Sequence, residues 1–212
     1  MAETTHTTSA GTGADPGADT GADPGADPVA TRPQRADARR NRGRILVAAA
    51  ETFAERGADA QMDDVARRAG VGVGTVYRHF PTKESLMGEL VRLKLDRMQK
   101  AAEAGLEVDD PWEAFAGVLR RGAEVMAADA ALRDALGRVP EAWEHAAAER
   151  ERLQAILAQV IRRGQEAGVI RPDFSVDEVP MLMCGVASSM SQHSDWDWRR
   201  HLELVLDGIR VR

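Results

Sequence analysis

Helical spacing of the apolar residues is the feature that most restricts the fold of this chain. From Ile45 onward apolar residues recur three or four positions apart, and no stretch alternates apolar and polar residues as a half-buried strand does. Ile45, Ala49 and Phe53 share one face in this way, and Gly57 follows them as a stop signal, so the first helix is expected over 37–56. The pattern predicts an all-α protein of about nine helices.

The stretch VGVGTVYRHF, residues 71–80, has the glycines of a turn rather than those of a phosphate-binding loop. A dinucleotide fingerprint needs a strand before its glycines, and a P-loop needs a Gly-Lys-Ser/Thr ending. Here a short helix ended by Gly70 precedes the glycines, and Gly74-Thr75 carries no lysine. A second short helix is expected over 73–80. Two short helices joined by a tight turn form a helix-turn-helix, whose second helix enters the DNA major groove.

The outward face of the helix over 73–80 suits contacts with DNA. Val73, Val76 and Phe80 fall on the side expected to pack on the preceding helices, which leaves the other side chains facing out. Exposed tyrosine, histidine and lysine can donate to phosphate, and arginine can reach phosphate or a guanine edge. The alternative is a surface helix with ordinary polar residues. The predicted DNA-binding residues are Arg39, Arg42, Arg44, Gly74, Thr75, Tyr77, Arg78, His79 and Lys83.

Charge is divided unevenly along the chain, whose net charge is −6. Residues 1–31 hold five acidic residues and no Lys or Arg. Residues 32–100 hold 15 Lys and Arg against 9 Asp and Glu, a net charge of +6, and residues 101–212 hold 13 against 20, a net charge of −7. A basic segment joined to acidic ones is typical of nucleic-acid binding, although a charge run is more often a solvated face.

Composition divides the chain into three parts. In residues 1–35 the triplet Gly-Ala-Asp occurs four times without a large apolar side chain, so this part is expected to be a disordered acidic tail. Residues 36–82 are expected to form the helix-turn-helix DNA-binding domain, and residues 83–212 a second, longer helical domain.

Capping residues predict where the later helices begin. Thr82 is expected to cap a long helix that runs to about residue 104, and Asp110, followed by proline and glutamate, is expected to start another. Further long helices are expected over 141–167, 177–193 and 196–210, the second of them capped by Asp177 so that Pro180 falls in its first turn.

The sequence also predicts the compartment of the protein. No apolar run approaches the ~20 residues that cross a bilayer, and the N-terminus lacks the basic and apolar regions of a secretory signal. The single cysteine, Cys184, cannot form an internal disulfide. We therefore expect a cytoplasmic protein with no membrane partner.

Residues about 40 to 90 resemble the DNA-binding region of the TetR (tetracycline-repressor-like) family. The resemblance rests on the spacing of four motifs, which are Phe53…Gly57, Val65-Ala66…Ala69-Gly70-Val71, Gly74-Thr75-Val76-Tyr77-Arg78-His79-Phe80 and Lys83-Glu84…Leu86. It implies a homodimeric regulator whose N-terminal domains bind a palindromic operator in double-stranded DNA. It also implies that residues 83–212 form an all-helical domain that dimerises and binds a small effector.

The resemblance further implies roles for individual residues. Thr75 is expected to contact bases or backbone of the operator, and Tyr77, His79 and Lys83 are expected to contact phosphates. Members of the family often have Ser or Thr as the cap of the second helix, in contact with phosphate, whereas this chain has Gln61. The departure leaves that phosphate contact without its usual hydroxyl donor.

Aromatic and methionine residues at helical spacing in the second half fit either core packing or the lining of an apolar cavity. Core packing is the commoner explanation, and the resemblance favours a cavity for some of them. The candidate pocket residues are Trp112, Phe115, Leu119, Met126, Trp143 and Met183. Few ionisable groups are expected among them, so a mostly apolar effector is predicted. The sequence shows no catalytic set and no Cys or His cluster, and we predict no metal, no cofactor and no enzymatic activity.

The apolar residues of the last two helices favour a homodimer. Val186, Met190, Leu202, Val205 and Ile209 offer more apolar surface than one two-helix edge can cover. We expect the helices over 177–193 and 196–210 of two copies to form a four-helix bundle across a two-fold axis.

Three functions remain open at this point. The first is a ligand-responsive repressor that an effector releases from its operator. The second is a DNA-binding regulator or architectural protein without a small-molecule ligand. The third is a helical enzyme or sensor that has lost DNA binding, and the presence of Tyr77 and Lys83 argues against it.

Overall fold

The computed structural model of the 212-residue chain describes residues 32–191 and 196–211. The predicted acidic tail lies outside the described residues as far as residue 31. Within the described ranges the chain forms ten α-helices, one 3-10 helix and no strand. The prediction of an all-α fold is confirmed, although the described helices outnumber the nine that were expected.

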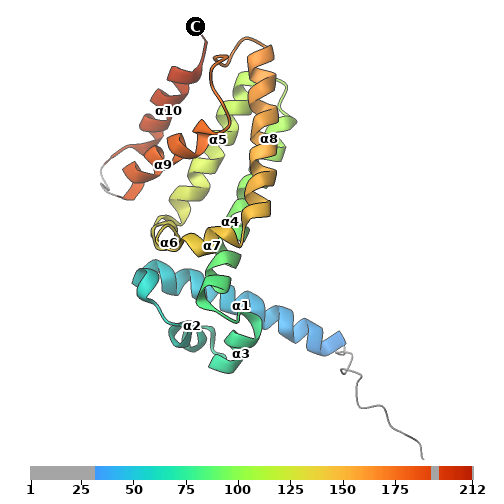
Figure 1. The fold of residues 1–212 in the computed structure, drawn as a ribbon, viewed down its shortest axis with the longest axis vertical. Helices are drawn as coiled ribbons and strands as arrows, with labels where there is room; N and C mark the ends of the chain where they lie inside the picture. The colour runs from blue at the N-terminus through green and yellow to red at the C-terminus, as the bar shows by residue number, and fades with distance from the viewer. Residues whose placement is uncertain (1–31, 192–195, 212) are drawn as a thin grey trace, which may run out of the picture.

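The helices divide the molecule into two parts (Figure 1). Figure 1 shows α1, α2 and α3 gathered at one end, while α4 leads away from them beside α8, and α6 and α7 lie between the two ends. The elements are α1 (Arg32–Arg56), η1 (Gly57–Asp59), α2 (Met62–Ala69), α3 (Val73–His79), α4 (Lys83–Leu106), α5 (Pro111–Ala128), α6 (Ala130–Leu136), α7 (Pro140–Glu144), α8 (Ala147–Glu166), α9 (Glu178–Ser191) and α10 (Trp198–Ile209).

Local signals set the ends of the first helices. Gly57 (φ 65°) and Gly70 (φ 62°) take the left-handed backbone conformation after α1 and α2, which glycine adopts without strain. At the start of α4 the Thr82 hydroxyl oxygen accepts a hydrogen bond from the Ser85 N–H (3.1 Å), so the predicted cap is confirmed. Helix α1 begins at Arg32, five residues earlier than predicted.

Two clusters of buried apolar residues form the interior. The first joins α1, α2 and α3 to the first half of α4 and includes Phe53, Val76 and Leu86, all fully buried. Leu136 of α6 and Ala142 of α7 belong to this same cluster. The second cluster lies among α5, α8, α9 and α10 and the last part of α4. Helix α4 therefore contributes to both cores, and α6 and α7 pack on the core of the first three helices.

The single long helix predicted over 141–167 is wrong. The chain turns between α7 and α8, where Ala146 leaves the helical conformation (φ −116°, ψ 22°). Ala142 and Ala146 are buried in the first core, whereas Val160 is buried in the second. One straight helix could not place its apolar face against both cores, so the turn follows from tertiary packing.

The dimer argument from apolar residues also needs correction. Val186, Leu202 and Ile209 are buried in the core of their own protomer, at 0%, 2% and 5% exposure, so they do not supply surface for a second copy. The large apolar side chains that α9 and α10 expose are Met181 (65%) and Leu204 (54%). Helix α9 begins at Glu178, which places Pro180 in the first turn as predicted.

Candidate DNA-binding surface and effector cavity

The helices α1, α2 and α3 with the start of α4 form the first unit of the molecule. Its core holds α3 with one face toward solvent. Val76 is fully buried, and Phe80, directly after the helix, is 3% exposed, so both side chains anchor α3. Among the predicted contact residues, those that face solvent are Gly74, Tyr77 and Arg78, and those that are half-buried are Thr75, His79 and Lys83. A Cβ atom added to Gly74 would meet no heavy atom within 4 Å, so the surface there is open.

Val73 was predicted to pack inward, and this prediction is wrong because its side chain is 41% exposed. Val73 is the first residue of α3, after the cap residue Gly72. Cβ atoms tilt toward the N-terminus of a helix, so the side chain of the first residue points past the helix end rather than onto the core.

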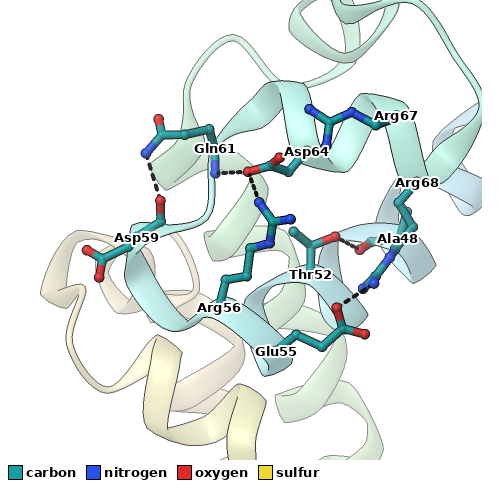
Figure 2. Close-up of polar contacts among 9 residues, drawn as sticks. All are labelled: Ala48, Thr52, Glu55, Arg56, Asp59, Gln61, Asp64, Arg67 and Arg68. Carbon is teal, nitrogen blue, oxygen red and sulfur yellow. Dashed lines mark hydrogen bonds and ion pairs between the residues drawn. The ribbon is translucent and has the colours of Figure 1, made fainter.

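Polar contacts hold α2 at a fixed position against α1 (Figure 2). The Gln61 backbone N–H donates to Asp64 Oδ2 (3.2 Å), and Arg56 Nη1 lies 2.8 Å from the same oxygen. The hydrogen bond from Gln61, helped by the charge of Arg56, holds the pKa of the Asp64 carboxyl below its ordinary value. Arg68 of α2 also bonds to Glu55 of α1. The Asp64 carboxylate thus accepts the hydrogen bond of the backbone N–H of Gln61, the residue that precedes α2.

The side chain of Gln61 turns away from the helix that it precedes. Its Nε2 donates to the Asp59 carbonyl oxygen at 2.7 Å, as Figure 2 shows. The amide therefore stabilises the turn between η1 and α2. This contact accounts for a glutamine at a position where a hydroxyl residue is common in the family that the sequence resembles.

Two arginines of α1 predicted to contact DNA also make contacts inside the protein. Arg44 Nη2 donates to the carbonyl oxygens of Ala69 (2.6 Å) and Gly70 (3.3 Å), where the last carbonyls of α2 lack helical partners. Arg42 Nη2 lies 2.7 Å from Glu89 Oε1, and its guanidinium is 5.3 Å from the ring centroid of Phe80. The structure thus gives Arg42 and Arg44 a role in joining α1 to α2 and α4 that sequence spacing did not indicate.

Two more cations of the predicted set, Lys83 and Arg39, belong to the same unit. Lys83 Nζ is 5.7 Å from the ring centroid of Phe53, at the start of α4. Arg39 is exposed on α1. Together with Tyr77 and Arg78, which are exposed on α3, these residues give the DNA-binding unit several hydrogen-bond donors.

A cavity of about 330 Å³ lies in the second part of the molecule. Four of the predicted pocket residues line it, namely Leu119, Met126, Trp143 and Met183. The full lining comes from α4 to α9 and the segment before α9 and consists of Lys94, Leu95, Met98, Val118, Leu119, Gly122, Met126, Arg133, Trp143, Arg150, Leu153, Gln154, Leu157, Val176, Val179, Pro180, Met183 and Cys184. Its volume falls in the lower part of the range of small-molecule sites, roughly 300–1,000 Å³.

Trp112 and Phe115 lie outside this lining, contrary to their predicted place. The ring of Phe115 is fully buried between Trp112 (centroids 6.0 Å apart) and Phe174 (5.8 Å, edge to face). The guanidinium of Arg210 lies 4.8 Å from the centroid of the Trp112 ring. These aromatic residues pack with the segment before α9 and with the C-terminal segment, and they fill the core there.

The lining contains basic groups that the sequence pattern did not predict. Lys94 is 8% exposed, and its Nζ has no hydrogen-bond partner among the residues that the structure describes. Burial is the main cause, and the nearby charge of Arg133 the second, of a pKa of Lys94 that is lowered to about 8. A signal was available in the sequence, because Lys94 follows Leu90 by four positions and Val91 by three, on the apolar face of α4.

The described ranges lack a metal site and a membrane-spanning helix. No group of three or more His, Cys, Asp and Glu side chains there could hold a metal ion. No helix in the described part combines the length and the apolar content that crossing a bilayer requires.

Comparison with known protein families agrees with this arrangement. Residues 45–90 match the family described as "Bacterial regulatory proteins, tetR family". Residues 110–211 match the one described as "Transcriptional regulator SbtR-like, C-terminal domain". The two matches cover the helix-turn-helix and most of the part that holds the cavity.

Individual relatives point to the same family. The chain is 37% identical over 84 residues to the HTH-type transcriptional regulator SAR0097 of Staphylococcus aureus, which covers 38% of this chain and 44% of that protein. It is 31% identical over 149 residues to the HTH-type transcriptional repressor KstR2 of Mycobacterium tuberculosis, which covers 65% of this chain and 73% of KstR2.

A solved structure extends the likeness to nearly the whole fold. The crystal structure of a TetR transcription regulatory protein from Mycobacterium vanbaalenii superposes with a TM-score of 0.58 at 36% identity. The superposition covers 84% of this chain and 99% of that one. The chain belongs to the TetR family of bacterial transcriptional regulators.

Proposed function

We propose that the protein is a repressor that binds a palindromic operator as a homodimer and is released from it by a small molecule. The observation that carries the proposal is the outward face of α3, with Gly74 open to solvent and Tyr77 and Arg78 exposed above a solid core. The name of KstR2, a transcriptional repressor, supports repression as the outcome of binding.

The proposed contacts follow from the side chains around α3. Thr75 and Arg78 lie where the helix would enter the major groove, so we assign them to base recognition. Tyr77, His79, Lys83 and Arg39 are assigned to phosphates, and Arg42 and Arg44 act mainly by holding α1 against α2 and α4. Phosphate contacts release counterions, so affinity for the operator should fall steeply with added salt.

The proposed dimer forms through the outer faces of α9 and α10. Met181 and Leu204 are more than half exposed there, and a second copy would cover them. A two-fold axis between these helices would present two α3 helices to the two halves of an inverted repeat. Sedimentation at micromolar concentration tests this assembly, which a monomer would contradict.

Two elements can carry a change at the cavity to the DNA-binding unit. Helix α4 starts in the first core and has Lys94 and Met98 in the cavity lining, and its 24 residues span about 36 Å. Helix α6 places Arg133 in the lining, whereas Leu132 and Leu136 pack in the first core. An effector that favours one position of α4 and α6 would therefore shift α3, and bound operator would weaken effector binding in turn.

Substitutions on α3 test the DNA-binding half of the proposal. Tyr77→Ala should weaken binding to all duplex sequences alike, because it removes a phosphate contact, whereas Arg78→Ala should change which sequences are selected from a random pool. Glu124→Ala, an exposed change on α5, is the control. An unchanged affinity of Tyr77→Ala would contradict the assigned contact face of α3.

A regulator without a ligand is the second candidate, and the cavity counts against it. Protein interiors are close-packed, and few voids in a domain exceed the size of a water molecule. An opening of about 330 Å³ between α4, α5, α8 and α9 is therefore better explained by a ligand than by imperfect packing.

A further inference from the structure

The buried amine of Lys94 restricts the chemistry of the effector, and the inference drawn from it rests on the proposed function. Lys94 lines the cavity, less than a tenth of the residue is exposed, and its Nζ has no partner in the described part of the chain. A buried charge without a partner is costly, and proteins normally pair such groups. The unpaired amine therefore lacks a partner that a ligand atom could supply.

The other charges near Lys94 do not remove its need for a partner. Arg133 donates to Asp134 Oδ1 at 3.0 and 3.2 Å, so that pair is largely balanced. Arg97 lies 3.4 Å from Asp129, which balances a second pair. Arg150, the remaining basic residue of the lining, is exposed to water. The described lining contains no Asp or Glu, so a cationic ligand would find no opposite charge in the lining itself.

The remainder of the lining is apolar. Leu119, Met126, Leu157, Val179 and Met183 are all buried, and they come from α5, α8 and α9. A ligand body against these side chains gains by leaving water, whereas a polar body such as a sugar phosphate would leave its hydroxyl groups unpaired. The ligand must combine an apolar body with one group that pairs with an amine.

We infer that the cavity binds an amphiphilic carboxylate, whose anionic group pairs with Lys94 Nζ and whose apolar body lies against α5, α8 and α9. One carboxylate matches one ammonium in charge, whereas a phosphate dianion would need a second cation inside the cavity. Arg133 is paired with Asp134, and Arg150 is exposed to water. The sequence predicts a mostly apolar effector, and the position of Lys94 restricts that prediction to apolar molecules with a carboxylate group.

Matched ligands test the charge requirement. Decanoate and 2-naphthoate would be titrated into the full-length protein at pH 7 by calorimetry, beside decanol and 2-naphthalenemethanol, which carry the same apolar bodies without the charge. At least one carboxylate should bind tenfold or more tightly than its alcohol, because the alcohol leaves the ammonium unpaired. If neither carboxylate exceeds its alcohol, the inference is overturned.

Matched variants test the assigned amine. Lys94→Met should lose at least tenfold in affinity for the carboxylate and keep its affinity for the alcohol, which also reports that the cavity is intact. Lys100→Met is the control, since Lys100 lies on the same helix but is exposed and paired with Asp96 at 2.7 Å. Full carboxylate affinity in Lys94→Met, or in Lys94→Gln as a second variant, would contradict the assignment.

The pH dependence supplies an independent readout. The pKa of Lys94 in the free protein is about 8, and pairing with a carboxylate raises it, so affinity should fall about tenfold from pH 7 to pH 9. The other charged or titratable groups around the amine are Arg97, Asp129, Arg133, Asp134, Arg150 and the exposed thiol of Cys184. Cys184→Ser should leave the profile unchanged, and a flat profile in the unsubstituted protein would count against the pairing.

Operator release separates this inference from the proposed function. Tight carboxylate binding that leaves operator DNA bound would support the carboxylate site and contradict effector-controlled repression. Release of DNA by the alcohol, equally in the unsubstituted protein and in Lys94→Met, would support effector control and overturn the role of Lys94.

Discussion

The two parts of this molecule differ in how the basic side chains that contact their interiors are paired. In the first unit Arg42 lies beside Glu89 and the ring of Phe80, and Arg44 caps the last carbonyls of α2. In the second part Lys94 is buried beside a cavity with its amine unpaired. The contacts of Arg42 and Arg44 hold α1, α2 and α4 in one relative position, which suits a surface that must fit DNA. The second part leaves a favourable interaction unmade, and under our proposal a carboxylate ligand would supply it.

The largest expected effect compares leucines in the two interiors. Leu86→Ala, in the solid first core, should cost about 4 kcal/mol of unfolding free energy, whereas Leu157→Ala, which borders the cavity, should cost about 2 kcal/mol. Leu157 already lacks packing partners on the side that faces the cavity. Urea unfolding at equal protein concentration measures both values, and equal costs would show that the cavity is closed in solution.

Replacing the unpaired amine should stabilise the unliganded protein. Lys94 is charged below its folded pKa of about 8 and also in the unfolded chain, so its burial cost is complete below pH 8 and disappears as pH rises toward 10.5. Lys94→Met should therefore gain up to about 3 kcal/mol at pH 7. Relative to this variant, the unsubstituted protein should gain stability between pH 8 and pH 10.5. Thermal melts across this range check the prediction, and a difference that stays constant with pH would refute it.

The junction between the two parts should tolerate little added volume. A Cβ atom at Gly88 of α4 would lie 2.5 Å from Cβ of His145 and 3.3 Å from the Ala142 carbonyl oxygen, so α4 and α7 would have to separate. Gly88→Ala should cost about 1–3 kcal/mol. Gly43→Ala, where no atom lies within 4 Å, is the matched control and should be neutral or slightly stabilising. Similar melting temperatures for the two variants would argue against tight packing at this junction.

The smallest effect on stability belongs to the DNA-binding face itself. Gly74→Ala should stabilise the protein by about 0.5–1 kcal/mol, because the site is open and alanine favours a helix. The same methyl group would stand between α3 and the bases, so affinity for the operator should fall. Melting temperature and a fluorescence binding titration measure the two effects. A variant that is more stable and binds DNA equally well would place the contact elsewhere.

Most of the first unit could be predicted from short-range patterns. The stops at Gly57 and Gly70 and the cap at Thr82 depend on residues within one helical turn, and the structure has all three. The exposed face of α3 followed from helical periodicity, apart from Val73, whose end position the periodicity does not describe. Local chemistry decides such features, so they can be read without knowledge of the fold.

Helical periodicity was enough to predict that this chain is helical, where most helices end, and which short helix presents a polar face to solvent, because these properties depend on neighbours three or four residues apart. Packing of the helices was needed to reveal the turn at Ala146, the burial of Val186 and Leu202 within one protomer, and the packing of Trp112 away from the cavity. Each of these depends on which helix meets a given apolar face, and periodicity shows that a face is apolar without showing what covers it. The unpaired amine of Lys94 belongs to the second group, since its environment is made by helices far apart in the chain.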